Sequence, residues 1–329
     1  MAGEDKASPS SGNSGPVARL LLRRAATPTG TAYRATLRWR QTPSRPPRRS
    51  GVRLPGARPE DAPFDAVIRE PGVTAAGPVI AVRLLGPLSA AIDGVPVENW
   101  TSTRQRSLFS YLLTHRQPWP PRDVLMDVFW PNSHPVAAKN SLNVAMHGLR
   151  RTLKAITDTP VIIYADGGYR LHPDIRLWLD VEEFDRYATA GRRHERNGEN
   201  ESAAEAFEFA VTLYRGDFLA DSLYEEWPAA IRERLRLAHL DVLGRLSDLH
   251  FAAGRYATCA DLCERIIECD SCREDAHRRL MLCYSRQGQS HLALIQYRAC
   301  VQALARELEV GPDPGTVALY ERIRRHDRV

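Results

Sequence analysis

The side chains with the most specific chemistry lie in residues 133–154, SHPVAAKNSLNVAMHGLRRTLK. Four apolar residues in this stretch recur with the spacing of one helix face, and they are Leu142, Met146, Leu149 and Leu153. At roughly 100° per residue, the opposite side carries amides, an imidazole, an aliphatic group and cations, without a carboxylate. These groups suit phosphates and base edges in a DNA major groove. That face consists of Asn140, Asn143, Val144, His147, Arg151 and Lys154, with Lys139 and Arg150 on its flank.

Position along this helix predicts the role of each side chain. Asn143 and His147 lie near the middle of the face, where side chains point into the groove, so we expect them to read bases. Val144 is the candidate contact for a thymine methyl group. Arg151 and Lys154 lie toward the C-terminal end and are expected to contact phosphates. The alternative interpretation is the solvated face of an ordinary amphipathic helix, with Ser133 or His134 as its cap and Pro135 as its first residue.

The preceding residues favour the DNA-binding interpretation because they predict two further helices. TSTRQRSLFSYLLTHR, with Thr101 or Ser102 as its cap, is the first. The second is the short PRDVLMDVFW, after Pro121. Its inward residues are predicted to be Val124, Leu125, Val128 and Phe129. This short helix and the helix at 133–154, whose outer face is polar and cationic, together form a helix-turn-helix.

Short β-rich segments flank these helices. Residues 79–100 predict about three antiparallel strands, with breaks at Gly86-Pro87 and Asp93-Gly94, and Asp-Gly favours a tight hairpin turn. VIIYADGGYRLHP predicts a second hairpin that turns at 166–168, the position of a wing. Arg170 leaves this turn and could contact a phosphate, or it could be an ordinary surface residue.

Residues 174–325 have helical periodicity and an internal repeat. When Gly254 is aligned with Gly288, 34 residues later, Leu246 matches Leu280 and Cys259 matches Ala293. A helix–turn–helix unit of this length is typical of tetratricopeptide repeats. Gly198 begins an earlier unit, whose small and bulky packing positions are Ala203, Phe207 and Ala210. We therefore predict stacked helix pairs.

Charge and composition divide the chain into three parts. Residues 1–77, rich in Arg and Pro, carry +7 (13 basic, 6 acidic) and predict a disordered extension. This extension is either a basic arm that adds non-specific DNA affinity, an inert tail, or the product of a start codon upstream of the natural one. Residues 78–173 carry +4 (10 basic, 6 acidic) and predict an α+β winged helix-turn-helix domain. Residues 174–329 carry −6 (22 basic, 28 acidic) and predict an all-α repeat domain.

Other classes of site have weak support. Cys269-x-x-Cys272 lacks the second pair that a zinc site usually has, so we expect the cysteines to pack between helices and expect no metal. The segment 225–228, EEWP, fits either a partner contact or, more simply, acids at a helix N-terminus. No nucleophile elbow, HExxH or phosphate loop is present, which argues against an enzyme and against a nucleotide cofactor. Apolar runs are too short for a membrane span, so a cytoplasmic protein is expected.

Taken in order, these segments resemble the antibiotic regulatory protein (SARP) family of actinomycetes, in which an OmpR-like winged helix precedes a bacterial transcriptional activation domain. The resemblance covers residues 79–325 and rests on strings such as TRQRSLFSYLL, PRDVLMDVFWP, AAKNSLNVAMHGLRRTL and LYRGDFLADSLYEEW. It implies binding to direct repeats in promoter DNA as a homodimer. It also implies activation through RNA polymerase, at genes such as those of secondary metabolism.

The chain departs from the larger members of that family. Residues 1–77 lie outside the family core, and neither an ATPase motif nor a receiver domain is recognisable. The sequence therefore shows no route for switching the protein on. The competing hypothesis is a tetratricopeptide-like scaffold whose winged helix contacts protein or non-specific DNA.

Overall fold

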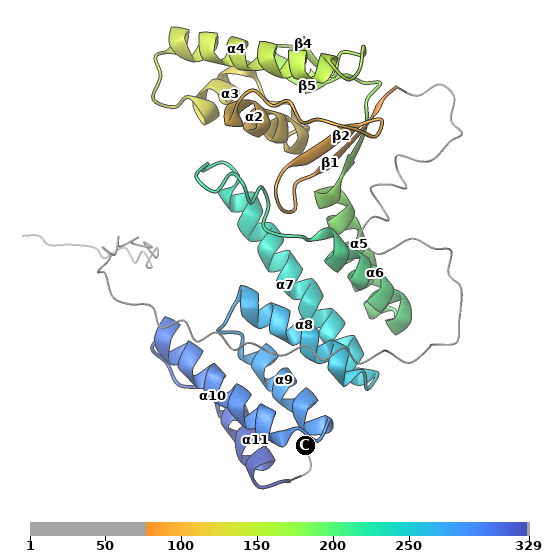
Figure 1. Cartoon of the computed structure of the whole chain (residues 1–329), viewed down its shortest axis with the longest axis vertical. Coiled ribbons are helices and arrows are strands. Elements are labelled where there is room, and N and C mark those ends of the chain that lie inside the picture. Colours follow the sequence, from red (N-terminus) through yellow and green to blue (C-terminus); the bar gives the residue numbers. More distant parts are fainter. Residues whose placement is uncertain (1–76, 328–329) are drawn as a thin grey trace, which may run out of the picture. The chain divides into compact units, whose positions relative to one another are not determined.

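The computed structural model describes residues 77–327 (Figure 1). The disordered extension expected at 1–77 lies, except for Gly77, outside the described residues. Among the described residues, no helix is both long and apolar enough to cross a membrane.

A four-stranded sheet begins the described region. Strand β1 (Val79–Arg83) pairs antiparallel with β2 (Ser89–Ile92), which pairs with the short β3 (Val95–Pro96). Asp93 and Gly94 have φ angles of 48° and 84°, so the Asp-Gly pair forms the predicted tight turn. The fourth strand, β6 (Arg176–Leu179), lies parallel to β1 on its other side.

Three helices follow the first three strands: α2 (Thr103–Thr114), α3 (Arg122–Phe129) and α4 (Pro135–Lys154). The predicted cap of α2 is confirmed, because the Ser102 side chain accepts from the Gln105 N–H. The predicted start of α4 is also confirmed, with His134 as cap and Pro135 in the first turn. One prediction for α3 is wrong: Val124 is 39% exposed, because this short helix buries only Leu125 and Phe129.

The predicted wing is a hairpin of β4 (Ile162–Ala165) and β5 (Gly168–Leu171). Its turn residues, Asp166 and Gly167, have φ angles of 51° and 79°. The hairpin is fixed against the start of α3, since the Arg122 N–H donates to the Gly167 carbonyl at 3.3 Å. A Cβ at Gly168 would lie 2.8 Å from the Pro120 carbonyl oxygen, so only glycine permits this approach.

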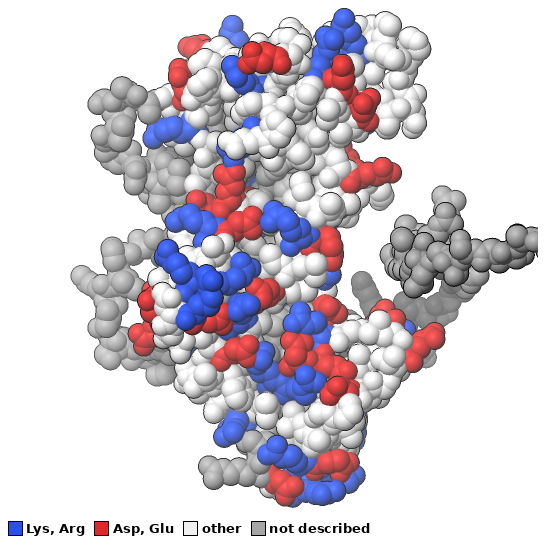
Figure 2. All heavy atoms as spheres, turned by 180° about the vertical axis from the view of Figure 1, so that it is seen from behind, with Lys and Arg blue, Asp and Glu red and all other residues white. Residues whose placement is uncertain are grey.

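The remaining chain is helical, and each helix packs against the next (Figure 1). Its elements are α5 (Asp180–Arg196), α6 (Asn200–Leu213), α7 (Ala229–Ala252), α8 (Tyr256–Cys269), α9 (Glu274–Arg286), α10 (Ser290–Glu307) and α11 (Pro314–Arg324). Figure 2 shows acidic and basic side chains intermixed over one face of this region, and several of them form ion pairs between helices, such as Arg245 with Glu195.

The predicted repeat is confirmed at its turns. Gly198, Gly254 and Gly288 follow the first helix of three successive hairpins, and their φ angles are 77°, 73° and 75°. The aligned core positions are buried in both units, as are the three expected positions of the earlier unit; they are Leu246, Leu280, Cys259, Ala293, Ala203, Phe207 and Ala210. Each hairpin thus has the tetratricopeptide-like form that the spacing predicted.

The junction between the two regions differs from the expected limit at residue 174. Strand β6 lies beyond that residue and yet belongs to the N-terminal sheet, with Leu177 opposite Ile80. The Leu84 and Leu85 N–H groups, at the end of β1, donate to the Asp180 carboxylate of α5 at 2.8 and 2.9 Å. A single cluster of buried apolar residues extends from the sheet into α5–α9.

A loop between α6 and α7, residues 214–228, completes this junction. The Leu219 N–H donates to the Leu84 carbonyl at 2.8 Å. The Trp227 indole N–H donates to Ser107 Oγ of α2 at 2.9 Å and to Glu225 Oε2 at 2.7 Å. The simpler interpretation of this segment, acids at a helix N-terminus, is therefore wrong for Glu225, because its carboxylate is bound to α2.

Candidate nucleic-acid interface

Helix α4 has one buried and one exposed face. Its predicted apolar stripe is buried against the helices and strands around it, as are Ala138 and Thr152. All eight of the predicted DNA-binding residues on this helix are exposed, and they are Lys139, Asn140, Asn143, Val144, His147, Arg150, Arg151 and Lys154. The structure thus brings them together on one continuous helical surface.

The chemistry of this surface fits a polyanion with base edges. No carboxylate occurs anywhere in α4, and Arg151 and Lys154 occupy its last turn. Cations in this position are also stabilised by the helix dipole. Val144 is 74% exposed, which is unusual for a large aliphatic side chain and leaves it free to contact a ligand.

Helix α4 is held from its buried side by α2 and by the residues just before α2. The Gln105 side chain accepts from the Thr101 N–H and lies over Gly148, where a Cβ would be only 2.4 Å from its amide nitrogen. The Thr152 hydroxyl donates to the Asn99 carbonyl at 3.2 Å. Because these contacts fix α4 from its buried side, its exposed side chains share one rigid support.

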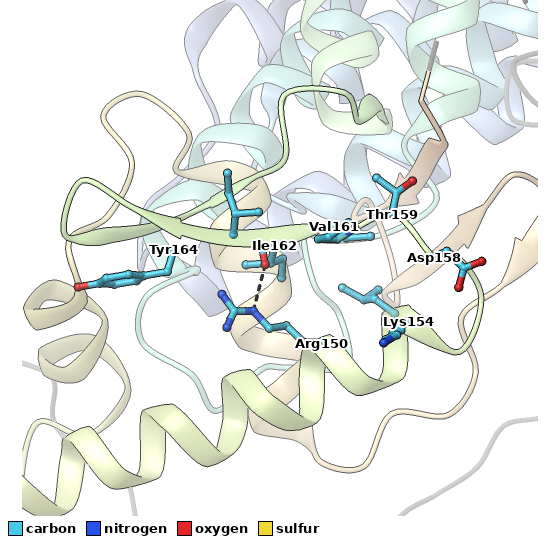
Figure 3. A pocket seen from close by; sticks show the side chains of 10 residues that line it. Arg150, Lys154, Asp158, Thr159, Val161, Ile162 and Tyr164 are labelled. Atoms are coloured by element: carbon cyan, nitrogen blue, oxygen red, sulfur yellow. Dashed lines mark hydrogen bonds between the residues drawn. The ribbon is translucent and has the colours of Figure 1, made fainter. Parts of the chain in front are cut away.

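Arg150 also has a structural role that the sequence did not indicate. Its Nε–H donates to the Ile162 carbonyl of β4 at 3.0 Å, and its guanidinium lies 5.5 Å from the centre of the Tyr169 ring (Figure 3). The interaction connects α4 to the hairpin. Burial raises the pKa of Tyr169, and the nearby Arg150 charge partly opposes that change.

Arg170, the predicted phosphate contact on the hairpin, is half-buried. Its Nη1 lies 3.3 Å from Asp166 Oδ2, within the same hairpin. The partner reduces the charge that Arg170 can offer to a phosphate, so the cations of α4 are the better candidates.

A groove of about 420 Å³ separates the C-terminal half of α4 from β4 (Figure 3). Arg150 and Lys154 line it from the helix, and Val161, Ile163 and Tyr164 line it from the strand side. Within residues 77–327, neither cation lies within ion-pairing distance of a carboxylate; Asp158, which also lines the groove, is not paired with Lys154. The groove therefore combines an apolar lining with two uncompensated positive charges.

The six cysteines are free, and Cys259, Cys263, Cys283 and Cys300 are buried among the repeat helices. Cys269 is exposed and Cys272 half-buried. In the part of the chain that the structure describes, no three His, Cys, Asp or Glu side chains are grouped as metal ligands would be. The buried thiols pack as small apolar residues.

The residues that connect the two regions carry no recognisable signal in the sequence. Asp180 is buried, and burial raises its pKa to about 6 although backbone N–H groups from β1 favour the charged form. Nothing in the local sequence separates it from the neighbouring acids, the exposed Glu182 and the half-buried Glu183. Ser107 and Trp227 were missed for a similar reason, since their contact joins residues far apart in the chain.

Comparisons with known proteins agree with this architecture. The family model of the bacterial transcriptional activator domain matches residues 179–324. The transcriptional regulatory protein MoaR1 of Mycobacterium tuberculosis is 28% identical over 258 residues, which cover 77% of this chain and 81% of that protein. The regulatory protein DnrI of Streptomyces peucetius is 28% identical over 253 residues, covering 75% and 92%. The chain is therefore similar to the SARP family of transcriptional regulators, and its residues 179–324 match the bacterial transcriptional activator domain.

For one group of relatives, the EmbR proteins, a solved structure can also be compared. EmbR of Mycobacterium bovis is 30% identical over 249 residues, 74% of this chain and 62% of that protein. The structure of Mycobacterium tuberculosis EmbR in complex with a low affinity phosphopeptide aligns with a TM-score of 0.64 and 25% identity, over 77% of this chain and 67% of that one. The match supports the predicted order of a winged helix followed by a helical domain.

Proposed function

We propose that this chain is a SARP-family regulator that binds specific DNA sequences through α4 and activates transcription. The observation that carries the proposal is the exposed face of α4, where cations, amides and Val144 lie together without a carboxylate. A face of this composition matches the phosphates and base edges of a major groove. Asn143 and His147 are the proposed base-reading residues.

The helical region is proposed to act through protein rather than DNA. Its charge of −6 (22 basic, 28 acidic, residues 174–329) disfavours binding to phosphates, which depends on cations. RNA polymerase and a second copy of the chain on direct repeats are its proposed partners. The limits 78–173 and 174–329 serve here as a proposed division between DNA contact and protein contact, with β6 as an element of the N-terminal sheet.

The test compares Asn143→Ala with Lys154→Ala on the promoter of the protein's own gene and on a scrambled duplex, by fluorescence anisotropy across a salt series. Asn143→Ala should cost about 1–3 kcal/mol on the operator and little on the scrambled duplex. Lys154→Ala should weaken both equally and reduce the salt slope by about one.

Two outcomes would contradict the proposal. If Asn143→Ala weakened both duplexes equally, Asn143 would not read a base. If no substitution on α4 altered binding, α4 would not be the recognition helix. An isolated helical region, residues 174–329, that shifted duplex DNA at moderate salt would overturn the proposed division of roles.

A further inference from the structure

The groove between α4 and β4 has features that DNA binding alone does not require. A phosphate contact needs only exposed cations, whereas this groove also has an apolar floor formed by buried and half-buried side chains, Leu153, Val161, Ile162 and Ile163. Its volume, about 420 Å³, lies within the range of small-molecule sites, roughly 300–1,000 Å³. Sites of this kind are mainly apolar and orient their ligand through a few polar groups.

The polar groups of this groove are cationic and positioned by the fold. Arg150 is held by its Nε–H bond to the Ile162 carbonyl, so its two terminal nitrogens remain available to a ligand (Figure 3). Lys154 lies one turn further along α4, and Tyr164, which is 50% exposed, lies at the opposite end of the groove (Figure 3). An anionic group between the two cations would gain charge-assisted hydrogen bonds.

A second cleft among the described residues differs from the α4–β4 groove in both respects. The cleft, about 540 Å³, lies between the end of α2 and the β5–β6 connection, and its lining is mainly polar. Its arginine, Arg116, is already paired with Glu182. The cleft therefore has a more polar lining than the α4–β4 groove, and its arginine is already paired.

We propose that the α4–β4 groove binds a small amphipathic anion, with an apolar ring system or short acyl chain on the floor and a carboxylate, sulfonate or phosphate between Arg150 and Lys154. If α4 binds DNA as proposed above, this groove also regulates that binding. Both cations belong to the DNA-facing surface, so a bound anion competes with DNA phosphates. The protein would then release its operator when such a compound accumulates.

Binding is tested on the full chain with anilinonaphthalene sulfonate, a fluorescent amphipathic anion, and with uncharged Nile red as the neutral probe. Lys154→Met keeps the aliphatic stem and removes the charge. Loss of one charge-assisted contact, worth about 1.4 kcal/mol, should weaken the anionic probe about tenfold and leave Nile red unchanged. Ile163→Thr keeps a β-branched side chain in β4 and should weaken both probes. Arg151→Gln removes a neighbouring cation that does not line the groove, and should change neither.

Regulation is tested by adding the anionic probe to the complex with DNA. The wild-type protein should release the operator, whereas Ile163→Thr should bind the operator normally and resist release. Arg151→Gln should bind DNA more weakly and still respond to the probe. Equal probe affinity in the wild type, Lys154→Met and Ile163→Thr would overturn the groove as a binding site. Normal probe binding without release of DNA would overturn the regulatory part alone. Failure of the wild-type protein to bind the operator would instead refute the proposed function.

Discussion

Replacing Trp227 with alanine should destabilise the winged helix, although Trp227 lies in the loop that precedes α7. The indole ring packs edge-on against Tyr111 of α2 at a centroid distance of 5.1 Å, and against Phe129 of α3 at 6.5 Å. Its N–H also bridges Ser107 and Glu225. Truncation of a core tryptophan costs roughly 3–5 kcal/mol, and because Trp227 is half-buried we expect about 3 kcal/mol.

Two variants separate the contributions to this loss. Trp227→Phe keeps an aromatic ring and removes the N–H donor, so it should cost about 1 kcal/mol, the net value of a hydrogen bond. Tyr224→Ala removes an aromatic side chain that is 101% exposed in the same loop, and should change stability by less than about 0.5 kcal/mol. All three variants lie in the same loop, and they differ in how much contact with α2 they remove.

The measurement is amide hydrogen exchange followed by mass spectrometry on the full chain. The contact joins α2 to the loop, so the protection of 103–114 and of 214–228 should fall together in Trp227→Ala. If protection of α2 were unchanged while the loop alone opened, the two regions would be energetically independent and the reasoning would be wrong. The same conclusion would follow if Trp227→Ala and Tyr224→Ala had equal effects.

Two further predictions concern packing and pH. Gly191→Ala should lower the free energy of unfolding by about 1–3 kcal/mol, because its Cβ would lie 2.4 Å from the Phe207 ring. The matched control is Gly244→Ala, whose Cβ would have no atom within 4 Å and which should stabilise the protein by up to about 1 kcal/mol. Urea unfolding that ranked the two variants the other way would refute this prediction. The pKa of Asp180 is raised to about 6, above the ordinary 3.8, so its contribution to stability is fully present below about pH 4 and is lost as the pH rises through about 6. The difference corresponds to roughly 3 kcal/mol. The stability of the wild type relative to Asp180→Asn, measured by urea titration at each pH, should fall over that window; a constant difference would contradict the assignment.

Much of the local structure could be predicted because short-range chemistry determines it. Ser102 and Pro135 mark helix starts through capping and a fixed φ, and Asp166-Gly167 forms its turn because both residues tolerate a positive φ. The exposed face of α4 followed from helical periodicity alone. Gly254 and Gly288 revealed the repeat because each ends the first helix of a hairpin with a positive φ.

The tertiary structure decided which cations near the proposed interface already have a bonding partner within the protein. Arg150 of α4 is bound to the Ile162 carbonyl of β4, a partner from another element, whereas Arg170 pairs with Asp166 inside its own hairpin. Periodicity predicts which face of its helix or strand a side chain occupies. It does not predict which atoms of another element that side chain contacts.

The junction between the two regions was decided by contacts between residues distant in the chain. Strand β6 joins β1 although the helix-turn-helix lies between them, and Asp180 is buried only because the end of β1 supplies N–H donors. Trp227 becomes part of the winged-helix core in the same way. The sequence determined the elements through interactions within a few residues, whereas their assembly depended on the burial of apolar surface and polar groups contributed from both regions.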